Sequence, residues 1–416
     1  MEVTPNMWEC RFLAGHHSTS PDGRQKVYGT RRSTSGAPAG PPASPRPALV
    51  ADAVQTATGT GAAAAVHALV ERWERRLANK GLRVGLADGE DARCVQAAIR
   101  LHRQGLIAPV LIGRPVEVNR AARSVGSALP SDLPVVDSAL GARNEEYVDT
   151  LANLLAHKAR TREQILELAT DPVWVAALMV RLGQVEAAVA GSSRPTADVV
   201  RAGLRVVGLA AGARVVSSCF LMALESGRTV GYADCAVIPM PSEDQLADVA
   251  ISTAATYTEL TGERPLVAML SFSTKGSASH ESVDRVRRSV DLVHRRAPGL
   301  AVDGELQFDA AYVPAVADTK APRSSVAGRA NVFIFPDLQA GNIAYKITER
   351  VGGAVALGPV LQGLAAPLND LSRGCSVNDI ATTALIAAAR AAEHVPRDDA
   401  QRIEERAEQG EGKEAP

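Results

Sequence analysis

Short apolar runs alternate with amphipathic stretches along most of this chain. Residues 83–86, 108–113, 266–272 and 331–335 are short runs rich in apolar side chains, and residues 92–104 have the spacing of an amphipathic helix. Strands of this length that alternate with helices are typical of βαβ units, whose parallel strands form a sheet covered by helices on both faces. The pattern therefore predicts the α/β fold class with largely parallel sheets.

The loops that follow the predicted strands are the expected place for function. Small or polar residues lie at or near the ends of several apolar runs, such as Gly113 and Ser271. An open α/β sheet binds its ligands just beyond the carboxyl ends of its strands. Candidate chemistry is therefore expected in these loops.

Size and charge favour a protein of two domains that acts on small molecules. The chain has 416 residues, and one hydrophobic core rarely grows beyond about 250–300 residues. Hydrophobic residues make up 46% and charged residues 22%, which is ordinary globular composition. The formal net charge of −1 creates no field that would attract nucleic acid or an anionic membrane, so neither is expected as a partner.

The most apolar stretch, residues 204–224, is predicted to be buried core. Arg205 and Arg214 interrupt it, and one charge near the centre of a bilayer costs about 3 kcal/mol, which argues against a membrane span. The amino-terminal segment contains no apolar signal-peptide core, so a cytoplasmic protein is expected.

The five cysteines indicate neither a disulfide framework nor a metal site. They are odd in number and scattered, with no Cys-x-x-Cys pair and no clustered histidines that would complete a zinc site. We therefore expect a reducing compartment and no structural metal.

Both ends of the chain are predicted to lie outside the folded domains. Residues 33–47 are rich in Ser, Pro and Gly and poor in large apolar side chains, so residues 1–60 are predicted to form a disordered tail. Residues 397–416 are dominated by Arg, Asp, Glu and Gln and are predicted to form a charged, solvated tail.

Residues 369–379 form the densest cluster of polar side chains, and the alanine-rich helical run 380–392 follows them directly. The cluster reads Asn-Asp-Leu-Ser-Arg-Gly-Cys-Ser-Val-Asn-Asp. Ser376 and Asp379 have the spacing of a capping box, in which two groups satisfy each other's backbone N–H at the start of a helix. Spacing alone therefore favours a structural role for Asp379, with catalysis as the alternative.

This cluster resembles the carboxy-terminal signature of the phosphate acetyltransferase family, and further blocks of the chain match that family in the same order. The resemblance covers roughly residues 80 to 395 and is strongest after residue 230. The matching blocks are residues 234–241, 267–278, 303–311, 320–328 and 333–346.

The resemblance implies two doubly wound α/β domains of the isocitrate and isopropylmalate dehydrogenase type. Domain I would comprise residues 61–212 and 361–396, and domain II would comprise residues 213–360. The active site of the family lies in the cleft between the two domains, and its members are usually homodimers. Closure of such a cleft excludes water, which would otherwise attack an acyl phosphate.

The implied function is reversible acetyl transfer between acetyl-CoA and inorganic phosphate, giving acetyl phosphate and coenzyme A. Coenzyme A is a substrate here, and no cofactor or metal is implied. The chemistry needs a base for the thiol, a donor for the oxyanion and cations for phosphate. The resemblance assigns the base to Asp379 and the adjoining donors to Ser372 and Arg373.

Proton transfer from the thiol limits this mechanism. The pKa of an ordinary aspartate is roughly 4 to 5 units below that of an ordinary thiol, so the transfer costs about 6 kcal/mol. The surroundings of the carboxyl, the cation Arg373 beside the thiol, or proton transfer concerted with attack would have to offset this cost.

Arg201, Lys275 and Asn369 are predicted to bind substrate, and the resemblance aligns Arg201 with an arginine that the family uses for substrate. An arginine suits phosphate because its planar fork donates two parallel hydrogen bonds. Lys275 lies in a Ser-Thr-Lys-Gly loop after a predicted strand, where Gly276 allows close approach of the backbone to a phosphate. Without the resemblance, Arg201 reads as a surface helix residue. For Lys275, a flexible loop lysine is an equal alternative.

The amino-terminal half departs from the family at Leu155. The alignment places Leu155 where the family has a second phosphate-binding arginine. Either one anion contact is missing, or Arg194 or Arg160 replaces it, or Leu155 is a core residue on the same helix as Leu151.

Three alternatives to acetyl transfer stay open. A dehydrogenase of the same architecture would need a nicotinamide site, and no Gly-x-Gly-x-x-Gly opens a helix after a predicted strand. A non-catalytic relative would keep the fold and lose site residues. A phosphate acyltransferase could also act on a longer acyl group, such as propionyl or butyryl.

Overall fold

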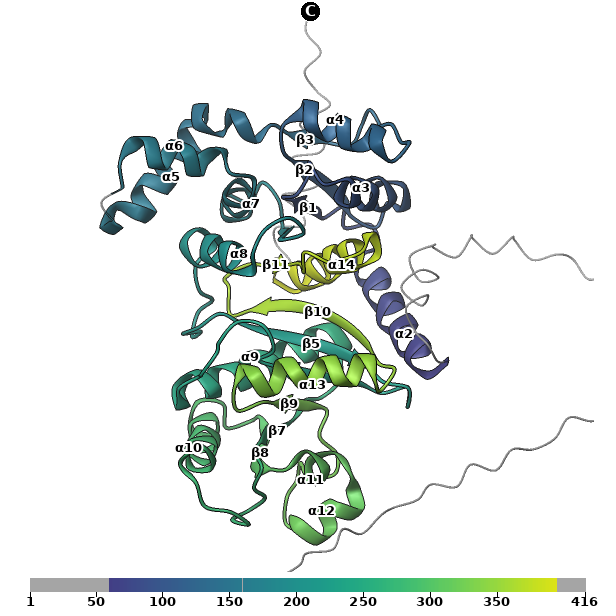
Figure 1. Cartoon of the computed structure of the whole chain (residues 1–416), viewed down its shortest axis with the longest axis vertical. Helices are drawn as coiled ribbons and strands as arrows, with labels where there is room; N and C mark the ends of the chain where they lie inside the picture. Colours follow the sequence, from purple (N-terminus) through teal and green to yellow (C-terminus); the bar gives the residue numbers. More distant parts are fainter. Residues whose placement is uncertain (1–59, 159, 395–416) are drawn as a thin grey trace, which may run out of the picture. The chain divides into compact units, whose positions relative to one another are not determined.

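The computed structural model describes residues 60–158 and 160–394, all of which belong to one compact unit of the chain. Two β-sheets with helices packed around them form this unit (Figure 1). The α/β fold class predicted from the sequence is confirmed. The two predicted tails, residues 1–60 and 397–416, lie outside the described residues except for Thr60, where helix α2 begins.

The first sheet is parallel throughout, with the order β11-β4-β1-β2-β3 in the described chain. Its strands are β1 (Arg83–Leu86), β2 (Ala108–Ile112), β3 (Val135–Val136), β4 (Ala187–Ala190) and β11 (Leu368–Asp370). Strands β2 and β3 follow β1 in the sequence and lie on one side of it, whereas β4 and β11 lie on the other side. The strand order therefore reverses between β1 and β4, which is where open parallel sheets bind ligands.

The second sheet is mixed, with the order β10-β5-β6-β9-β7-β8 in the part of the chain that the structure describes. Its strands are β5 (Ser217–Ala223), β6 (Thr229–Ala233), β7 (Leu266–Leu270), β8 (Ala301–Leu306), β9 (Val332–Ile334) and β10 (Val355–Gln362). Strand β5 is antiparallel to both neighbours, β6 and β10, whereas the other pairs are parallel. A tight turn joins β5 to β6, closed by Leu224 N–H donating to Arg228 C=O at 2.8 Å, and a turn this short permits only antiparallel pairing.

Helices cover both faces of each sheet. Val84 and Leu86 of β1 pack with α3 and α14, whereas Ala188 and Ala190 of β4 pack with α5, α6 and α7 on the opposite face. The second sheet lies between α9 and α10 on one face and α11, α12 and α13 on the other. The bounds are α3 (Ala92–Gln104), α4 (Pro115–Ser124), α5 (Glu145–Leu155), α6 (Arg162–Thr170), α7 (Pro172–Arg181), α8 (Thr196–Ala202), α9 (Glu243–Thr261), α10 (Glu281–Arg296), α11 (Phe308–Tyr312), α12 (Pro314–Lys320), α13 (Leu338–Arg350) and α14 (Val377–His394).

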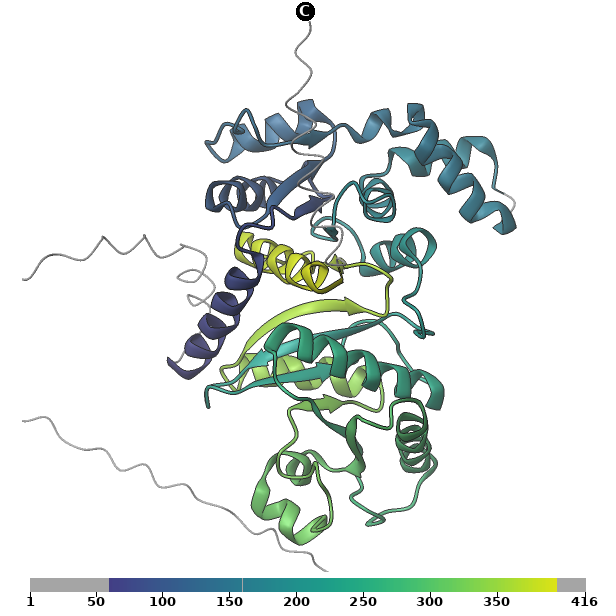
Figure 2. The same ribbon diagram turned by 180° about the vertical axis from the view of Figure 1, so that it is seen from behind.

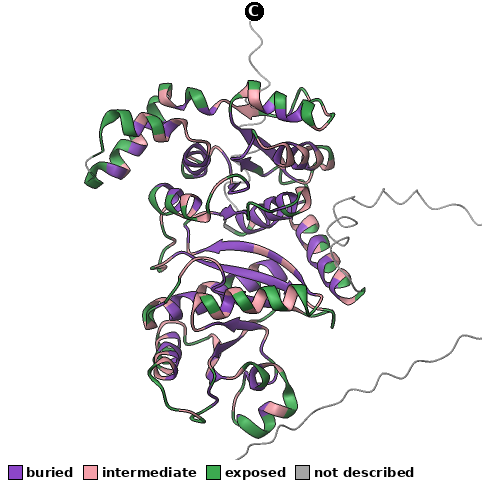
Figure 3. Ribbon diagram, viewed as in Figure 1, coloured by how far each residue is buried: buried purple, intermediate pink, exposed green. Residues whose placement is uncertain are grey.

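Two helices pack against the cores of both sheets. One side of α14, including Ile380, Ala384 and Ala388, packs into the core of the first sheet, and Ile386 and Ala389 pack into that of the second, so most of α14 is buried (Figure 3). Helix α2 (Thr60–Leu77), which the sequence pattern did not predict, lies beside α14 (Figure 2). Its Trp73 Nε1–H donates to the carbonyl of Leu260 at 2.9 Å.

The chain crosses between the sheets twice. It leaves the first sheet after β4 and enters the second at β5, and it returns between β10 and β11. The sequence places these crossings near residues 213 and 360, and the division into two domains at those points stays a prediction. Within the described residues, no helix has the length and apolar character needed to span a bilayer.

Leu155 lies in the hydrophobic core. It is 2% exposed and packs with Tyr147, Val148 and Leu151 on the inner side of α5, against residues of α6 and α7. An arginine at this position could not reach an anion without leaving the core. Of the three interpretations of Leu155, the structure supports a core residue.

We expect Leu155→Arg to lower the free energy of unfolding by several kcal/mol, because it would bury an unpaired guanidinium. Ala152→Arg, on the exposed side of the same helix, is the matched control and should leave stability nearly unchanged. Urea unfolding of the two variants checks this. Equal stability of both variants would contradict the core assignment.

Candidate active site

Three loops converge at the carboxyl ends of the central strands of the first sheet. Asp88, after β1, is buried and accepts hydrogen bonds from the turn after β4: Gly191 N–H at 2.8 Å, Ser192 N–H at 3.0 Å and the Ser193 hydroxyl. A buried carboxylate is stable only when it is well paired. The Asp88 carboxylate therefore fixes the turn after β4 to the loop after β1.

Arg93, in the first turn of α3, connects this pair of loops to the signature loop after β11. Its guanidinium donates to the carbonyl of Ser192 at 2.9 Å, and to those of Arg373 and Cys375 at 3.0 and 2.8 Å. The helix N-cap, Asp91, holds the guanidinium through an ion pair of 2.6 Å. One cation thus sets the path of the loop that carries Ser372 and Arg373.

A pocket of about 500 Å³ opens where the signature loop faces the second sheet. Its walls come from the turn after β4, from the signature loop with the start of α14, from β5 and β10, and from α13. Its polar and charged lining residues are Arg194, Thr196, Asn342, Tyr345, Glu349, Arg350, Asp370, Ser372, Arg373 and Asp379. The three residues that the family resemblance assigns to chemistry, Ser372, Arg373 and Asp379, therefore share one pocket.

Asp379 forms the capping box that its spacing predicts. Ser376 N–H donates to Asp379 Oδ2 at 2.8 Å, and Asp379 N–H donates to Ser376 Oγ at 3.1 Å. The carboxylate is nevertheless exposed and lines the pocket. The structural role is thus realised, and the catalytic role stays a prediction.

Ser372 and Arg373 are exposed on the signature loop. Ser372 Oγ accepts from Gly374 N–H at 3.3 Å, which leaves the hydroxyl proton available to a ligand. Within the described chain, the Arg373 guanidinium has no hydrogen-bond or ion-pair partner. It is therefore available for an anion.

Cys375 is buried behind this loop. Burial raises the pKa of its thiol to about 11, although the nearby Arg93 opposes this shift. The thiol therefore stays protonated at neutral pH and is a poor nucleophile.

Asp370, the last residue of β11, is a pocket residue that the sequence reasoning missed. It is 1% exposed, and the Thr196 hydroxyl donates to its Oδ2 at 2.6 Å. Burial, with a smaller contribution from the nearby Asp88, raises the pKa of this carboxyl to about 7, although the Thr196 hydroxyl and the Leu371 backbone act to lower it. The aspartate stood next to a predicted site residue, but its burial depends on β4 and α8, which sequence spacing does not reveal.

Asn369, predicted to bind substrate, is fully buried in β11 and does not line the pocket. Its Oδ1 accepts from the Leu361 N–H of β10 at 3.1 Å, which ties the two sheets together. This geometry favours a structural role.

Lys275, also predicted to bind substrate, lies away from this pocket in the loop after β7. Its ammonium pairs with Asp303 and donates to the carbonyl of Gly304 at 2.9 Å. Glu305 fixes the same loop, because its carboxylate accepts from Gly276 N–H at 2.8 Å and from the Ser273 hydroxyl at 3.0 Å. These contacts explain why both sequence blocks are rich in polar residues without invoking substrate.

Arg201 lies on α8 beside the pocket. It pairs with Asp198 at 2.6 Å, and its side chain is 55% exposed. It lines a second cavity of about 850 Å³, together with Arg205 and several apolar side chains. Thr196 and Ala236 line both cavities, so the two adjoin.

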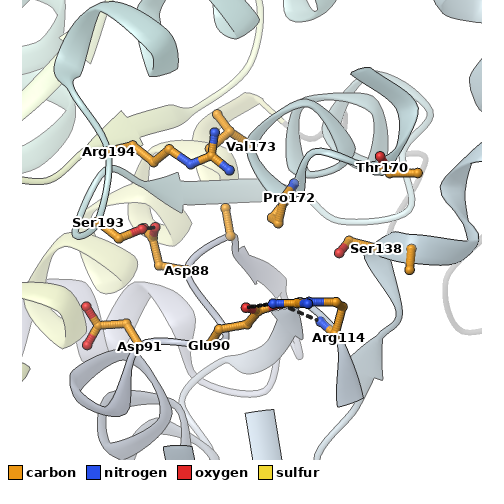
Figure 4. Close-up of a pocket in the computed structure, with 12 residues that line it drawn as sticks. Asp88, Glu90, Asp91, Arg114, Ser138, Thr170, Pro172, Val173, Ser193 and Arg194 are labelled. Carbon is orange, nitrogen blue, oxygen red and sulfur yellow. Dashed lines mark hydrogen bonds and ion pairs between the residues drawn. The ribbon is translucent and has the colours of Figure 1, made fainter. Parts of the chain in front are cut away.

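Arg194 lies in the turn after β4 and borders the pocket on one side and another cavity of about 650 Å³ on the other. Figure 4 shows the cavity of about 650 Å³, with Asp88 and Ser193 near Arg194 and the Glu90–Arg114 ion pair across from them. Asp171 holds the Arg194 guanidinium at 2.7 Å. Of the two arginines considered as replacements for the family arginine, Arg194 is the one that lines the pocket.

No group of three or more His, Cys, Asp or Glu side chains that could hold a metal ion occurs among residues 60–158 and 160–394. The expectation that the reaction needs no metal stays a prediction.

Comparison with known proteins identifies relatives of one activity. The model of the family described as phosphate acetyl/butaryl transferase matches residues 68–388. The phosphate acetyltransferase of Acetivibrio thermocellus is 43% identical over 311 residues, which cover 74% of this chain and 93% of the relative. That of Paracoccus denitrificans is 45% identical over 308 residues, which cover 73% and 93%.

A solved structure agrees with these relatives. The phosphotransacetylase of Streptococcus pyogenes superposes with a TM-score of 0.74 at 39% sequence identity, and the match covers 78% of this chain and 98% of that one. The fold and the sequence therefore point to the same family.

The contribution of the Glu305 carboxylate to the stability of the fold should depend on pH. Burial raises its pKa, but hydrogen bonds from Arg287, Gly276 and Ser273 outweigh burial and hold the pKa at about 2. A carboxyl with a lowered folded-state pKa stabilises the fold above its unfolded pKa, near 4.5, and this contribution is lost as pH falls through about 2. Glu305→Gln should therefore lose about 2–3 kcal/mol of stability at pH 7 and less at pH 3.

Chemical unfolding at both pH values measures this effect. Glu225→Gln, in an exposed turn, is the control and should behave like the wild type. A deficit in Glu305→Gln that does not shrink on acidification would contradict the assignment.

Proposed function

This chain belongs to the phosphate acetyl/butaryl transferase family, and we propose that it moves an acetyl group reversibly between coenzyme A and inorganic phosphate. The observation that carries this proposal is the shared pocket of Ser372, Arg373 and Asp379, lined by the further cations Arg194 and Arg350. Coenzyme A, acetyl-CoA, phosphate and acetyl phosphate are its substrates and products, and no other cofactor is required.

In the direction of acetyl-CoA synthesis, the coenzyme A sulfur attacks the acetyl carbonyl of acetyl phosphate. A carbon–sulfur bond forms, the carbon–oxygen bond to phosphate breaks, and phosphate leaves with the bonding electrons. The thiol proton passes to Asp379. The reverse reaction returns that proton to the thiol as phosphate attacks acetyl-CoA.

Asp379 is suited to this role because capping occupies only part of its carboxylate. Oδ2 accepts the Ser376 N–H, whereas Oδ1 has no partner among the described residues. The position in the first turn of α14 holds the carboxylate at the rim of the pocket. We propose that Oδ1 receives the thiol proton.

The cations of the pocket offset part of the cost of this transfer. A positive charge near the bound thiol lowers the thiol pKa, and Arg373 is the guanidinium without a partner in the described chain. We propose that Arg373 binds the phosphoryl oxygens and that the Ser372 hydroxyl donates to the developing oxyanion. Arg201, in the adjoining cavity, would hold an anionic part of coenzyme A.

We further propose that the chain forms a homodimer through α13. The outer side of this helix exposes Ile343 and Ile347, and Val351, directly after the helix, continues the row; these large apolar side chains are 57%, 54% and 82% exposed. Such a stripe on a free surface is unfavourable, and two copies related by a two-fold axis would cover it. The other side of α13 supplies Asn342 and Tyr345 to the pocket, so the interface would also support the site.

A cytoplasmic location is proposed as well. Cys94, Cys219, Cys235 and Cys375 are buried free thiols. Thiols in this state suit a reducing compartment.

Replacing Asp379 with Asn separates catalysis from capping. The amide oxygen of the new side chain can still accept the Ser376 N–H, so we expect the melting temperature to change little while kcat falls about 10²–10⁴-fold. Ser376→Ala is the matched control, because it removes the other half of the capping box and keeps the carboxylate. It should cost about 1 kcal/mol of stability and leave kcat nearly intact.

Thioester absorbance and thermal unfolding of the two variants measure these effects. Loss of activity in proportion to loss of stability in both variants would favour capping as the whole role of Asp379.

Ile347→Glu tests the proposed dimer. A charge in the middle of the apolar stripe should shift the mass measured by light scattering from dimer to monomer. Val116→Glu, which replaces an equally prominent exposed side chain on α4, is the control and should leave the mass unchanged. A wild-type monomer, or a dimer that survives Ile347→Glu, would contradict an interface on α13.

A further inference from the structure

Two carboxyl groups face the turn after β4, and they share its hydrogen-bond donors unequally. Asp88 takes the Gly191 and Ser192 N–H groups and the Ser193 hydroxyl. Asp370 receives only the Thr196 hydroxyl from the side chains around it, at 2.6 Å. Asp88 thus accepts three hydrogen bonds from this turn, whereas the side chains around Asp370 give it one.

Among the described residues no hydrogen bond reaches Oδ1, the second oxygen of Asp370, although the nearby Leu371 backbone, like the Thr196 hydroxyl, acts to lower the pKa of this carboxyl. Oδ1 is shielded from solvent, and it packs directly against the backbone of Gly191. A Cβ added at Gly191 would clash with this oxygen, and the φ of +108° at Gly191 is itself a conformation that side chains rarely allow. An unpaired, desolvated carboxylate oxygen costs free energy, which a bound proton removes.

Asp370 also lies in the wall of the pocket that would hold phosphate. Its neighbours in sequence, Leu371 and Ser372, line the same pocket, as does its partner Thr196. A negative charge at this wall would repel a phosphate-type anion, whereas a neutral carboxyl would not.

The other charged groups nearby do not duplicate this behaviour. Asp88 is fully paired, Asp198 and Arg201 pair with each other on α8, and the Cys375 thiol stays protonated up to about 11. The remaining charged groups that line the pocket are Arg194, Glu349, Arg350, Arg373 and Asp379. Of the titratable pocket residues that the structure describes, Asp370 is the one whose pKa burial raises to about 7.

We propose that Asp370 is a proton-holding wall residue of this pocket, and that anion binding requires its neutral form and is accompanied by proton uptake at its carboxyl. Because binding and protonation are linked, an anion in the pocket would stabilise the proton on Asp370, and that proton would tighten the anion by the same factor. The inference rests on the proposed function, because it takes the ligand to be a phosphate-type anion.

Sulfate is the appropriate probe, because it is a dianion throughout neutral pH and needs no turnover. Calorimetric titration of the full chain with sulfate should give a Kd that rises roughly five- to tenfold from pH 6 to pH 8. Repeating the titration in buffers of different ionisation enthalpy should reveal net proton uptake near pH 7.

Asp370→Asn mimics the neutral carboxyl and should bind sulfate with the same affinity at both pH values and without proton uptake. Thr196→Val removes the donor that favours the ionised form, so it should move the pH dependence upward. Thr196→Ser keeps the hydroxyl and should restore the wild-type profile. The threonine pair keeps the test valid if Asp370→Asn folds poorly.

A wild-type Kd independent of pH, or the same pH dependence in Asp370→Asn, would overturn the inference. Absence of sulfate binding at any pH would also overturn it. None of these results depends on acetyl transfer, so a protein that binds sulfate as expected but forms no thioester would contradict the proposed function alone.

Discussion

The pairing of the buried Asp88 carboxylate is the constraint on which the site depends. A buried anion must find donors, and Asp88 finds them in the backbone and side chains of the turn after β4. This commits the turn to one conformation and places Arg194 and Thr196 at the pocket. Arg93 extends the same network to the signature loop by donating to the carbonyls of Ser192, Arg373 and Cys375.

The capping of α14 and the proposed chemistry of Asp379 use different parts of one carboxylate. Oδ2 holds the helix start, and this fixed position keeps Oδ1 at a pocket lined with guanidinium groups. A base held by a helix end loses little conformational entropy when substrate binds. The same capping box would therefore also pre-organise Asp379 for its proposed role as the base.

The sequence predicted the features that depend on local pattern and missed those that depend on packing. Strands β1, β2, β7 and β9 follow from short apolar runs, and the capping box follows from the spacing of Ser376 and Asp379. The antiparallel pairing of β5 with β10 was not predictable, because β10 is distant in sequence and short apolar runs do not specify direction. Arg194 was predicted only as one of two possible replacements for the family arginine that aligns with Leu155.

The surroundings of the predicted substrate-binding residues also depend on packing that the sequence does not reveal. Asn369 is polar in sequence and buried in the structure, where it pairs with β10. Lys275 follows a strand, as a phosphate-binding residue would, yet its charge is satisfied by Asp303. Asp370 carries no distinguishing local pattern, and its properties arise only when Gly191 and Thr196 pack against it.

We propose that this pocket transfers an acetyl group directly between phosphate and coenzyme A. The most direct measurement mixes the purified protein with acetyl phosphate and coenzyme A and follows thioester absorbance together with release of phosphate. We expect one thioester to form for each phosphate released, in a reaction that reverses when phosphate is added to acetyl-CoA. Phosphate release without thioester, or no reaction from a folded protein that binds both substrates, would contradict it.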